Sequence, residues 1–189
     1  VNNISYVIFL FREEYIMKRE LRKKYLEIRK NIKDKRLKDK VLFEKIIASK
    51  KVKNAKEILI YVSKDDEVST TDLIEYLLNQ KKIVAVPKVV NQDLEFHKIK
   101  SFYDLSIGYK GILEPNKNNK IKTFKSCISI TPGICFSKDG YRIGYGKGFY
   151  DRFYQKNNIY KIGLCYKECI TDDKFWEEHD VKVDEVITD

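Results

Sequence analysis

A strand, helix and strand pattern between residues 57 and 89 constrains most strongly how this chain folds. The run EILIYVS (57–63) is a short apolar stretch, which is typical of a strand covered on both faces. STTD (69–72) then offers capping side chains before the helical stretch LIEYLLNQKK (73–82), and a second apolar run, IVAVPKV (83–89), follows. This order predicts two parallel strands joined by a right-handed crossover.

The remaining segments continue the alternation. Apolar residues at helical spacing predict a first helix from Met17 to Ile32 and a second over 36–49, the second burying Leu37, Val41, Ile46 and Ile47. Further expected elements are a more exposed strand near 94–99, a loop at 111–120, a buried strand at 127–136 broken by Pro132 and Gly133, a helix opening at 151–154, and strands at 160–166 and 184–189. The pattern predicts a single α/β domain of three layers, with a mostly parallel, Rossmann-like sheet flanked by helices.

Residues 1–16 are expected to be an N-terminal extension of a domain that comprises residues 17–189. The only methionine, Met17, immediately precedes the first amphipathic stretch. ISYVIFLF (4–11) is apolar but shorter than the about 20 residues that span a bilayer, and the flanking features of a signal peptide are missing. Deletion of residues 1–16 should therefore leave folding and activity intact; an insoluble or inactive truncation would contradict this.

The composition favours anionic partners and a reducing compartment. A net charge of +10 attracts nucleic acid or a phosphorylated or polycarboxylate small molecule, although the dispersed lysines also suit an ordinary solvated surface. The cysteines form no C-x-x-C pair, and with only two histidines a closed zinc site is hard to assemble. We expect Cys127, Cys135, Cys165 and Cys169 to be reduced, mostly buried thiols of a cytoplasmic protein.

Half of the eight glycines lie in GYRIGYGKGFYDRFY (140–154). The alternation of Gly144, Gly146 and Gly148 fits neither the dinucleotide fingerprint G-x-G-x-x-G nor the Walker pattern G-x-x-x-x-G-K-[ST]. A flexible backbone that precedes a helix can instead turn its N–H groups toward an anion.

Charged residues within this run suit a phosphate with a metal. Arg142 and Lys147 supply positive charge, and Asp151 stands where the helix begins. A carboxylate close to phosphates is a usual magnesium ligand, so nucleotide with Mg²⁺ is the economical interpretation. A tight glycine turn in which Asp151 only caps the helix stays open as an alternative.

Two acidic segments lie elsewhere. Asp65, Asp66 and Glu67 follow the first buried strand, at the sheet edge where α/β proteins bind ligands, although an acidic loop that caps a helix fits equally well. The second acidic segment lies near the C-terminus and contains Glu177, Glu178, Asp180 and Asp184. Any of these acids could be a second metal ligand or part of an ordinary solvated surface, and His179 beside them is expected to face solvent.

The first helix begins with a basic segment, MKRELRKK. Lys18 and Arg22 are four residues apart and so share one helical face. This pair could hold a triphosphate, or both side chains could simply face solvent.

In their order along the chain, these motifs resemble the 5-formyltetrahydrofolate cyclo-ligase family. The segments that carry the resemblance are KRELRKKYLEIRK, YVSKDDEVSTTDLIEYLLNQKKIVAVPKV, GILEP, TPGICFSKDGYRIGYGKGFYDRF, KIGLCY and EEHDVKVDEVIT, which cover nearly everything from Met17 onward. The resemblance implies that Mg·ATP drives conversion of 5-formyltetrahydrofolate to 5,10-methenyltetrahydrofolate, through an N5-iminium phosphate and with release of ADP and phosphate.

The resemblance also implies residue roles. The implied ATP-binding residues are Lys18, Arg22, Arg142, Gly144, Tyr145, Gly146, Lys147, Gly148, Phe149 and Tyr150, with Arg142 and Lys147 catalytic on the phosphates. The implied folate-binding residues are Val62, Glu67, Tyr145, Gly146, Lys147, Gly148 and Phe149, and the implied magnesium ligands are Asp151 and Asp180. Tyr145 and Phe149 differ from the residues that relatives carry there, which bears on folate stacking.

The expected partners are ATP and a folate, with or without a polyglutamate tail, bound by a cytoplasmic monomer that binds neither nucleic acid nor membrane. A basic nucleic-acid-binding module and a phosphosugar or CoA-type enzyme on a similar scaffold are the alternatives.

Overall fold

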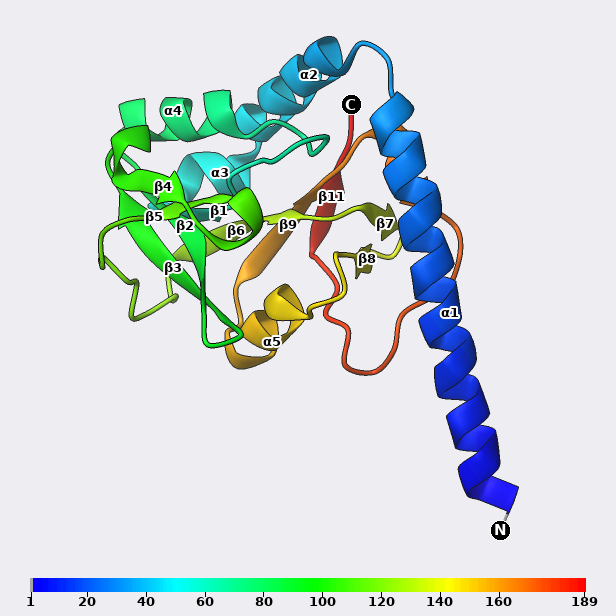
Figure 1. Cartoon of the computed structure of the whole chain (residues 1–189). Helices are drawn as coiled ribbons and strands as arrows, with labels where there is room; N and C mark the ends of the chain where they lie inside the picture. Colours follow the sequence, from blue (N-terminus) through cyan, green and yellow to red (C-terminus); the bar gives the residue numbers. More distant parts are fainter. Residues whose placement is uncertain (1) are drawn as a thin grey trace.

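A six-stranded sheet forms the centre of the computed structural model, which describes residues 2–189, with side chains from residue 16 onward (Figure 1). The strands in spatial order are β11 (Glu185–Ile187), β9 (Tyr160–Leu164), β6 (Cys127–Pro132), β1 (Glu57–Ile60), β2 (Ile83–Val90) and β3 (Asp93–Ile99). Every neighbouring pair is parallel except β2 with β3, which form an antiparallel hairpin. The predicted mostly parallel sheet is confirmed, with the expected strand near 94–99 as its antiparallel edge.

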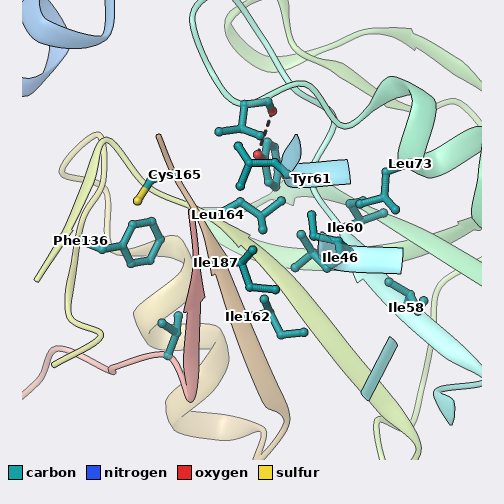
Figure 2. Packing of buried hydrophobic residues seen from close by; sticks show 14 of the residues in the cluster. Ile46, Ile58, Ile60, Tyr61, Leu73, Phe136, Ile162, Leu164, Cys165 and Ile187 are labelled. Atoms are coloured by element: carbon teal, nitrogen blue, oxygen red, sulfur yellow. Dashed lines mark hydrogen bonds between the residues drawn. The ribbon is translucent and has the colours of Figure 1, made fainter. Parts of the chain in front are cut away.

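Helices cover both faces of this sheet, which gives the three predicted layers. These helices are α2 (Lys35–Ala48), α3 (Lys50–Asn54) and α4 (Thr71–Asn79) on one face and α5 (Phe149–Lys156) on the other. Successive side chains of a strand point to opposite faces. Accordingly, Ile58 and Ile60 of β1 pack with Leu73 of α4 (Figure 2), whereas Leu59 packs in a separate cluster with Phe153 of α5.

Helix α1 (Asn2–Asn31) packs outside the main sheet, against a small three-stranded sheet (Figure 1). The strands of that sheet are β10 (Ile170–Thr171), β7 (Cys135–Ser137) and β8 (Arg142–Ile143). Leu21 and Tyr25, two of the apolar residues at helical spacing in α1, are buried, and the Tyr25 hydroxyl donates a hydrogen bond to the carbonyl of Ile170 (3.3 Å). This bond attaches helix α1 to β10, which follows β9 and η3 in the chain.

The short remaining elements connect these layers. They are the β4 (Leu105–Ile107) and β5 (Leu113–Pro115) hairpin and the 3₁₀ turns η1 (Phe102–Asp104), η2 (Tyr109–Gly111) and η3 (Lys167–Cys169). The expected loop at 111–120 was wrong in its first part, because β5 lies within it. No helix in the described part of the chain is long and apolar enough to cross a membrane.

Two details of the predicted helices differ from the structure. The first helix extends back to Asn2 rather than beginning at Met17, and the proposal that residues 1–16 are an extension stays a prediction. In α2 the residues that face the sheet are Leu42 and Ile46, whereas Leu37 and Val41, predicted to be buried, are 65% and 39% exposed. Apolar residues occupy more than one side of this helix, and contact with the sheet decides which side is buried.

Candidate active site

The sheet reverses its direction of growth between β1 and β6. From β1 the chain passes through α4 to β2 on one side, and from β6 it passes through α5 to β9 on the other, while β1 and β6 are themselves parallel neighbours (Figure 1). Loops that leave two such strands diverge and open a crevice at their carboxyl ends, where α/β proteins bind ligands. The acidic loop follows β1 directly, whereas the chain that leaves β6 passes through β7 and β8 before it reaches the glycine-rich loop.

Side-chain hydrogen bonds close the loop after β1. The buried Thr70 hydroxyl donates to the carbonyl of Tyr61 (2.8 Å) and accepts from the amide of Ser63 (3.0 Å), and the Ser63 hydroxyl accepts from the amide of Thr70 (3.1 Å). The expectation that STTD caps α4 through a side chain was therefore wrong, because the Thr70 hydroxyl bonds across the loop instead. These bonds hold the acidic segment in a fixed position over the strand ends.

Of the three acids in this loop, Glu67 alone combines partial burial with a hydrogen bond inside its own turn. Its Oε2 accepts from the amide of Lys64 (3.0 Å), whereas Asp65 is exposed and Asp66 pairs with Lys35 (2.6 Å). Burial raises the pKa of Glu67 above its usual value, and the bond from Lys64 acts in the opposite direction. Val62, the other predicted folate contact of this loop, is buried.

The glycine-rich loop takes backbone conformations that favour glycine. Gly146 (φ +83°) and Gly148 (φ +63°) lie in the left-handed region, and Gly148 immediately precedes α5. A Cβ at Gly144 would meet no atom within 4 Å, so the space beside this residue is open. Lys147 is exposed. An open, glycine-lined loop before a helix N-terminus retains the geometry of an anion cradle.

Basic residues on one face of α1 contact this loop and the C-terminal acids. Arg22 Nε donates to the carbonyl of Gly144 (2.7 Å), and its Nη2 lies 3.4 Å from where a Gly146 Cβ would be. Lys18 Nζ lies 2.6 Å from Glu177 Oε1 and 2.6 Å from Asp180 Oδ2. The two predicted cations of α1 thus touch the predicted phosphate loop and one predicted metal ligand.

Lys18 lies between two carboxylates in a partly buried position. Burial lowers the pKa of its ammonium group, but the hydrogen bonds to Asp180 and Glu177 outweigh that effect, and the net pKa is raised. Lys18 is therefore charged at neutral pH and occupies the place of a cation beside Asp180.

Asp151 is oriented by a buried arginine. Arg142, whose side chain is 4% exposed, has Nη2 at 2.9 Å from Asp151 Oδ1, an ion pair whose angle does not make a hydrogen bond, and it donates through Nη1 to the carbonyl of Val181 (2.6 Å). The same Oδ1 accepts from the amide of Val181 (3.0 Å), the residue after Asp180. The two predicted metal ligands, Asp151 and Asp180, thus lie on segments that contact each other. The guanidinium of Arg142 pairs with Asp151 and does not face solvent. Its predicted contact with phosphates stays a prediction.

Acidic oxygens gather near the C-terminus. Single ligand atoms of Glu177, His179 and Asp180 lie within 4.8 Å of one another, a set to which Asp151 does not belong. The set consists mainly of carboxylates, which suit Mg²⁺, and the ammonium group of Lys18 already pairs with two of its members, Glu177 and Asp180. His179 is solvent-facing, as expected. Asp184 instead pairs with Lys161 (2.9 Å), which indicates a structural role.

The aromatic residues of the loop divide between surface and interior. Residue Tyr145 is 56% exposed, but its hydroxyl accepts a hydrogen bond from Arg29 Nη2 (2.8 Å). Phe149 packs edge-on to Tyr109, with centroids 6.3 Å apart. The Tyr150 hydroxyl is buried and has no hydrogen-bond partner among the described residues.

Arg29 was not predicted, although its spacing offered a signal. It follows Arg22 by seven residues and Lys18 by eleven, so all three lie on one face of α1. The apolar periodicity of this turn instead indicated Tyr25 and Ile28 as residues of its apolar face.

This arrangement defines an enzyme of the α/β class, with a glycine-rich loop, a partly buried carboxylate and charged side chains gathered where a parallel sheet changes direction. Comparison with known proteins narrows the class.

The family model described as the 5-formyltetrahydrofolate cyclo-ligase family matches residues 15–189. A 5-formyltetrahydrofolate cyclo-ligase from Mus musculus is 31% identical over 155 residues, covering 74% of this chain and 76% of the mouse protein. The solution structure of the 5,10-methenyltetrahydrofolate synthetase of Aquifex aeolicus has a TM-score of 0.81 at 28% identity, covering 91% of this chain and 89% of the other. The corresponding Mycoplasma pneumoniae synthetase has a TM-score of 0.73 at 25% identity, covering 90% and 97%.

The chain belongs to the 5-formyltetrahydrofolate cyclo-ligase family, as its motifs predicted, and its function is that of this family's enzymes.

Proposed function

We propose that this cyclo-ligase uses Mg·ATP to convert 5-formyltetrahydrofolate to 5,10-methenyltetrahydrofolate at the carboxyl ends of β1 and β6. One observation carries the proposal: Arg22 holds the glycine-rich loop through the Gly144 carbonyl while Lys18, one turn away, contacts Asp180. Segments more than 120 residues apart in the sequence are thus in hydrogen-bond contact, and each of them is predicted to bind ATP or the metal.

The reaction needs ATP because a formamide carbonyl is a poor electrophile and its oxygen a poor leaving group. In the proposed mechanism the formyl oxygen attacks the γ-phosphorus, and the bond from that phosphorus to the ADP oxygen breaks. The product is an N5-iminium phosphate and ADP. N10 then attacks the formyl carbon, loses its proton, and phosphate leaves with the former formyl oxygen.

Phosphoryl transfer of this kind depends on alignment and charge neutralisation. Lys147 and the loop amides from Gly144 to Gly148 would contact the phosphates, with Arg22 holding the loop and Lys18 adding charge at its edge. Arg142 would act by orienting the Asp151 carboxylate, since its guanidinium is buried against that side chain.

Asp151 and Asp180 would hold Mg²⁺ together with phosphate oxygens. Both contacts of Asp151 use Oδ1, and within the described residues Oδ2 has no hydrogen bond. Asp180 Oδ2 pairs with the Lys18 ammonium (2.6 Å), so this cation lies beside a carboxylate that would hold the ion. When bound, the ion would neutralise charge on the transferring phosphoryl group.

The folate would bind beside Glu67 and the aromatic residues of the loop. A carboxylate at this position can accept hydrogen bonds from the amino and ring N–H groups of a pterin. Val62 lies at the start of the same loop, and the exposed ring of Tyr145 together with Phe149 offers flat apolar surface. We further propose that the enzyme is a cytoplasmic monomer that accepts folates with or without polyglutamate tails.

The test is direct. Protein, 5-formyltetrahydrofolate, ATP and Mg²⁺ are mixed, and the near-ultraviolet absorbance of the methenyl product is followed with release of ADP and phosphate. We expect product that depends on both ATP and Mg²⁺, with none when either is omitted or when EDTA is added. Turnover without ATP, or no turnover in the complete mixture, would contradict the proposal.

A further inference from the structure

Arg29 is a cation buried inside the molecule with incomplete hydrogen bonding. Its residue is 3% exposed; Nη2 donates to the Tyr145 hydroxyl (2.8 Å), Nη1 makes a long bond to the Gly133 carbonyl (3.4 Å), and Nε has no partner among the described residues. Withdrawing a charge from water costs several kcal/mol unless it is well paired. Apolar side chains fill the other buried positions of this stripe, Leu21 and Tyr25, so packing alone does not account for an arginine.

The guanidinium lies at the carboxyl edge of the sheet, on the same cavity as Glu67. The cavity is also lined by residues from the ends of three adjacent parallel strands, namely Tyr61, Gly133 and Cys165. Its volume of about 10 Å³ is close to what a single water requires. No ion pair joins Arg29 to Glu67 within the described part of the chain, but their charges are close enough for Arg29 to oppose the rise that burial causes in the pKa of Glu67.

The second partner of Arg29 belongs to the other loop of the site. Tyr145 is more than half exposed, yet its hydroxyl accepts a hydrogen bond from the buried Arg29. A tyrosine side chain has only two rotatable bonds, so fixing the hydroxyl fixes the orientation of the ring that a flat ligand would contact.

We propose that Arg29 is a positioning residue for the folate, because its guanidinium holds Tyr145 of the glycine-rich loop and its side chain lines the same small cavity as Glu67 of the loop after β1. The inference rests on the proposed function, in which both of these residues face the folate. Lys18, Arg22, Lys147 and the loop amides serve the nucleotide, whereas Arg29 holds Tyr145 through its side-chain hydroxyl, so removal of Arg29 should weaken folate binding more than nucleotide binding.

The experiment compares Arg29→Met and Arg29→Lys with the control Lys30→Met, which removes an exposed positive charge at the adjacent position. Without Arg29 the Tyr145 ring is no longer held in one orientation, so Arg29→Met should raise the KM for 5-formyltetrahydrofolate about tenfold or more, which corresponds to about 1.4 kcal/mol. The KM for ATP should stay within about twofold. Arg29→Lys retains a cation in reach of Tyr145 and should restore part of the loss, and Lys30→Met should behave as wild type.

Tyr145→Phe removes only the hydroxyl and tests the contact without altering the buried charge. It should raise the folate KM several-fold, and Arg29→Met combined with Tyr145→Phe should cost no more than Arg29→Met alone, because both remove one interaction. Additive effects would contradict the link between these two side chains.

Direct binding separates failure of this inference from failure of the proposed function. Titration of 5-formyltetrahydrofolate without ATP, followed calorimetrically, should give a dissociation constant that rises in Arg29→Met as the KM does. A folded Arg29→Met with wild-type folate affinity overturns the role of Arg29, whatever the turnover. Equal losses of affinity for folate and for ATP also overturn it.

Wild-type protein that binds folate without ATP-dependent turnover would instead refute the proposed function, and the binding constants of the variants would still decide the role of Arg29. If Arg29→Met fails to fold, wild-type folate affinity in Tyr145→Phe overturns the inference.

Discussion

Glu67 is a carboxylate placed where burial disfavours its charge. Burial raises its pKa, and the Lys64 amide and the charge of Arg29 compensate only in part. Below the unfolded-state pKa both states are protonated and nothing is lost. As pH rises, the unfolded chain releases its proton first, so the folded state loses stability until Glu67 also ionises.

Glu67→Gln should therefore separate stability from activity. The variant cannot ionise, and its thermal stability relative to wild type should increase from pH 4 to pH 7. About 1 kcal/mol corresponds to about 2–4 °C in a protein of this size. Its folate KM should rise, because an amide cannot accept two pterin N–H groups. Thermal unfolding at several pH values, with steady-state kinetics, checks both outcomes. If the thermal stability of Glu67→Gln relative to wild type decreased from pH 4 to pH 7, that result would be inconsistent with a raised pKa of Glu67.

Lys147 and Asp151 lie four residues apart but should respond differently to substitution. Lys147 is exposed, so Lys147→Ala should change the free energy of unfolding by less than about 0.5 kcal/mol. If it contacts the transferring phosphoryl group, turnover should fall about 10²–10³-fold.

Asp151→Asn should reduce turnover and stability together. It leaves the nearly buried Arg142 without a counter-charge. Breaking a fully buried pair costs about 3–5 kcal/mol, and the partial exposure of Asp151 places its loss below that range. Chemical denaturation with turnover measured on the same preparations distinguishes the two residues. Unaltered stability in Asp151→Asn would show that Arg142 does not depend on this carboxylate.

The glycine-rich loop is the element on which nucleotide binding is proposed to depend, and two of its glycines have different roles. Gly146 has a positive φ and lies against Arg22, whereas Gly144 has open space where a side chain would be. The first glycine is required by backbone geometry, and the second leaves room for a ligand.

Gly146→Ala should cost about 1–2 kcal/mol of stability, since an L-residue is strained in the left-handed region, while its methyl group would make ordinary contact with Arg22. Gly144→Ala should leave the free energy of unfolding within about 0.5 kcal/mol of wild type but raise the KM for ATP, because its methyl group occupies the space offered to phosphates. Denaturant unfolding and kinetics in ATP check the pair. Unchanged kinetics in Gly144→Ala would place the phosphates elsewhere.

Local sequence patterns predict some elements better than others. The β1, α4 and β2 unit could be predicted because an apolar run, a helical period and a second apolar run occur in adjacent stretches. The buried side of α2 could not, since its apolar residues occupy several sides and the sheet selects Leu42 and Ile46. Thr70 could likewise cap a helix or bond across a loop, and only the position of Tyr61 decides between them.

At the scale of the whole molecule, the four cysteines confirm the prediction of buried thiols. All are free and buried, and burial raises the pKa of Cys135 to about 12 and of Cys169 to about 11. Thiolate is the reactive form, so neither exposure nor ionisation favours reaction at neutral pH.

A thiol reagent such as DTNB should therefore modify none of the cysteines in the native protein within minutes at pH 7.5, and all four after denaturation in guanidinium chloride. Rapid modification of any native cysteine would indicate local opening near β6, β7 or β9. Unfolding-dependent modification also offers a probe of stability for the variants above.

The amino-acid sequence by itself determined most of the helices and strands around the central sheet, the mostly parallel character of that sheet, the family and the residue types of the site, because periodicity, glycine spacing and motif order are local properties of the chain. Only the tertiary structure decided what each charge faces. Arg142 is turned to Asp151, Lys18 to Asp180 and Glu177, and Arg29 to Tyr145, with partners up to 162 residues apart. The pairing of a charge depends on distance and burial in three dimensions, and neither can be read from spacing along the chain.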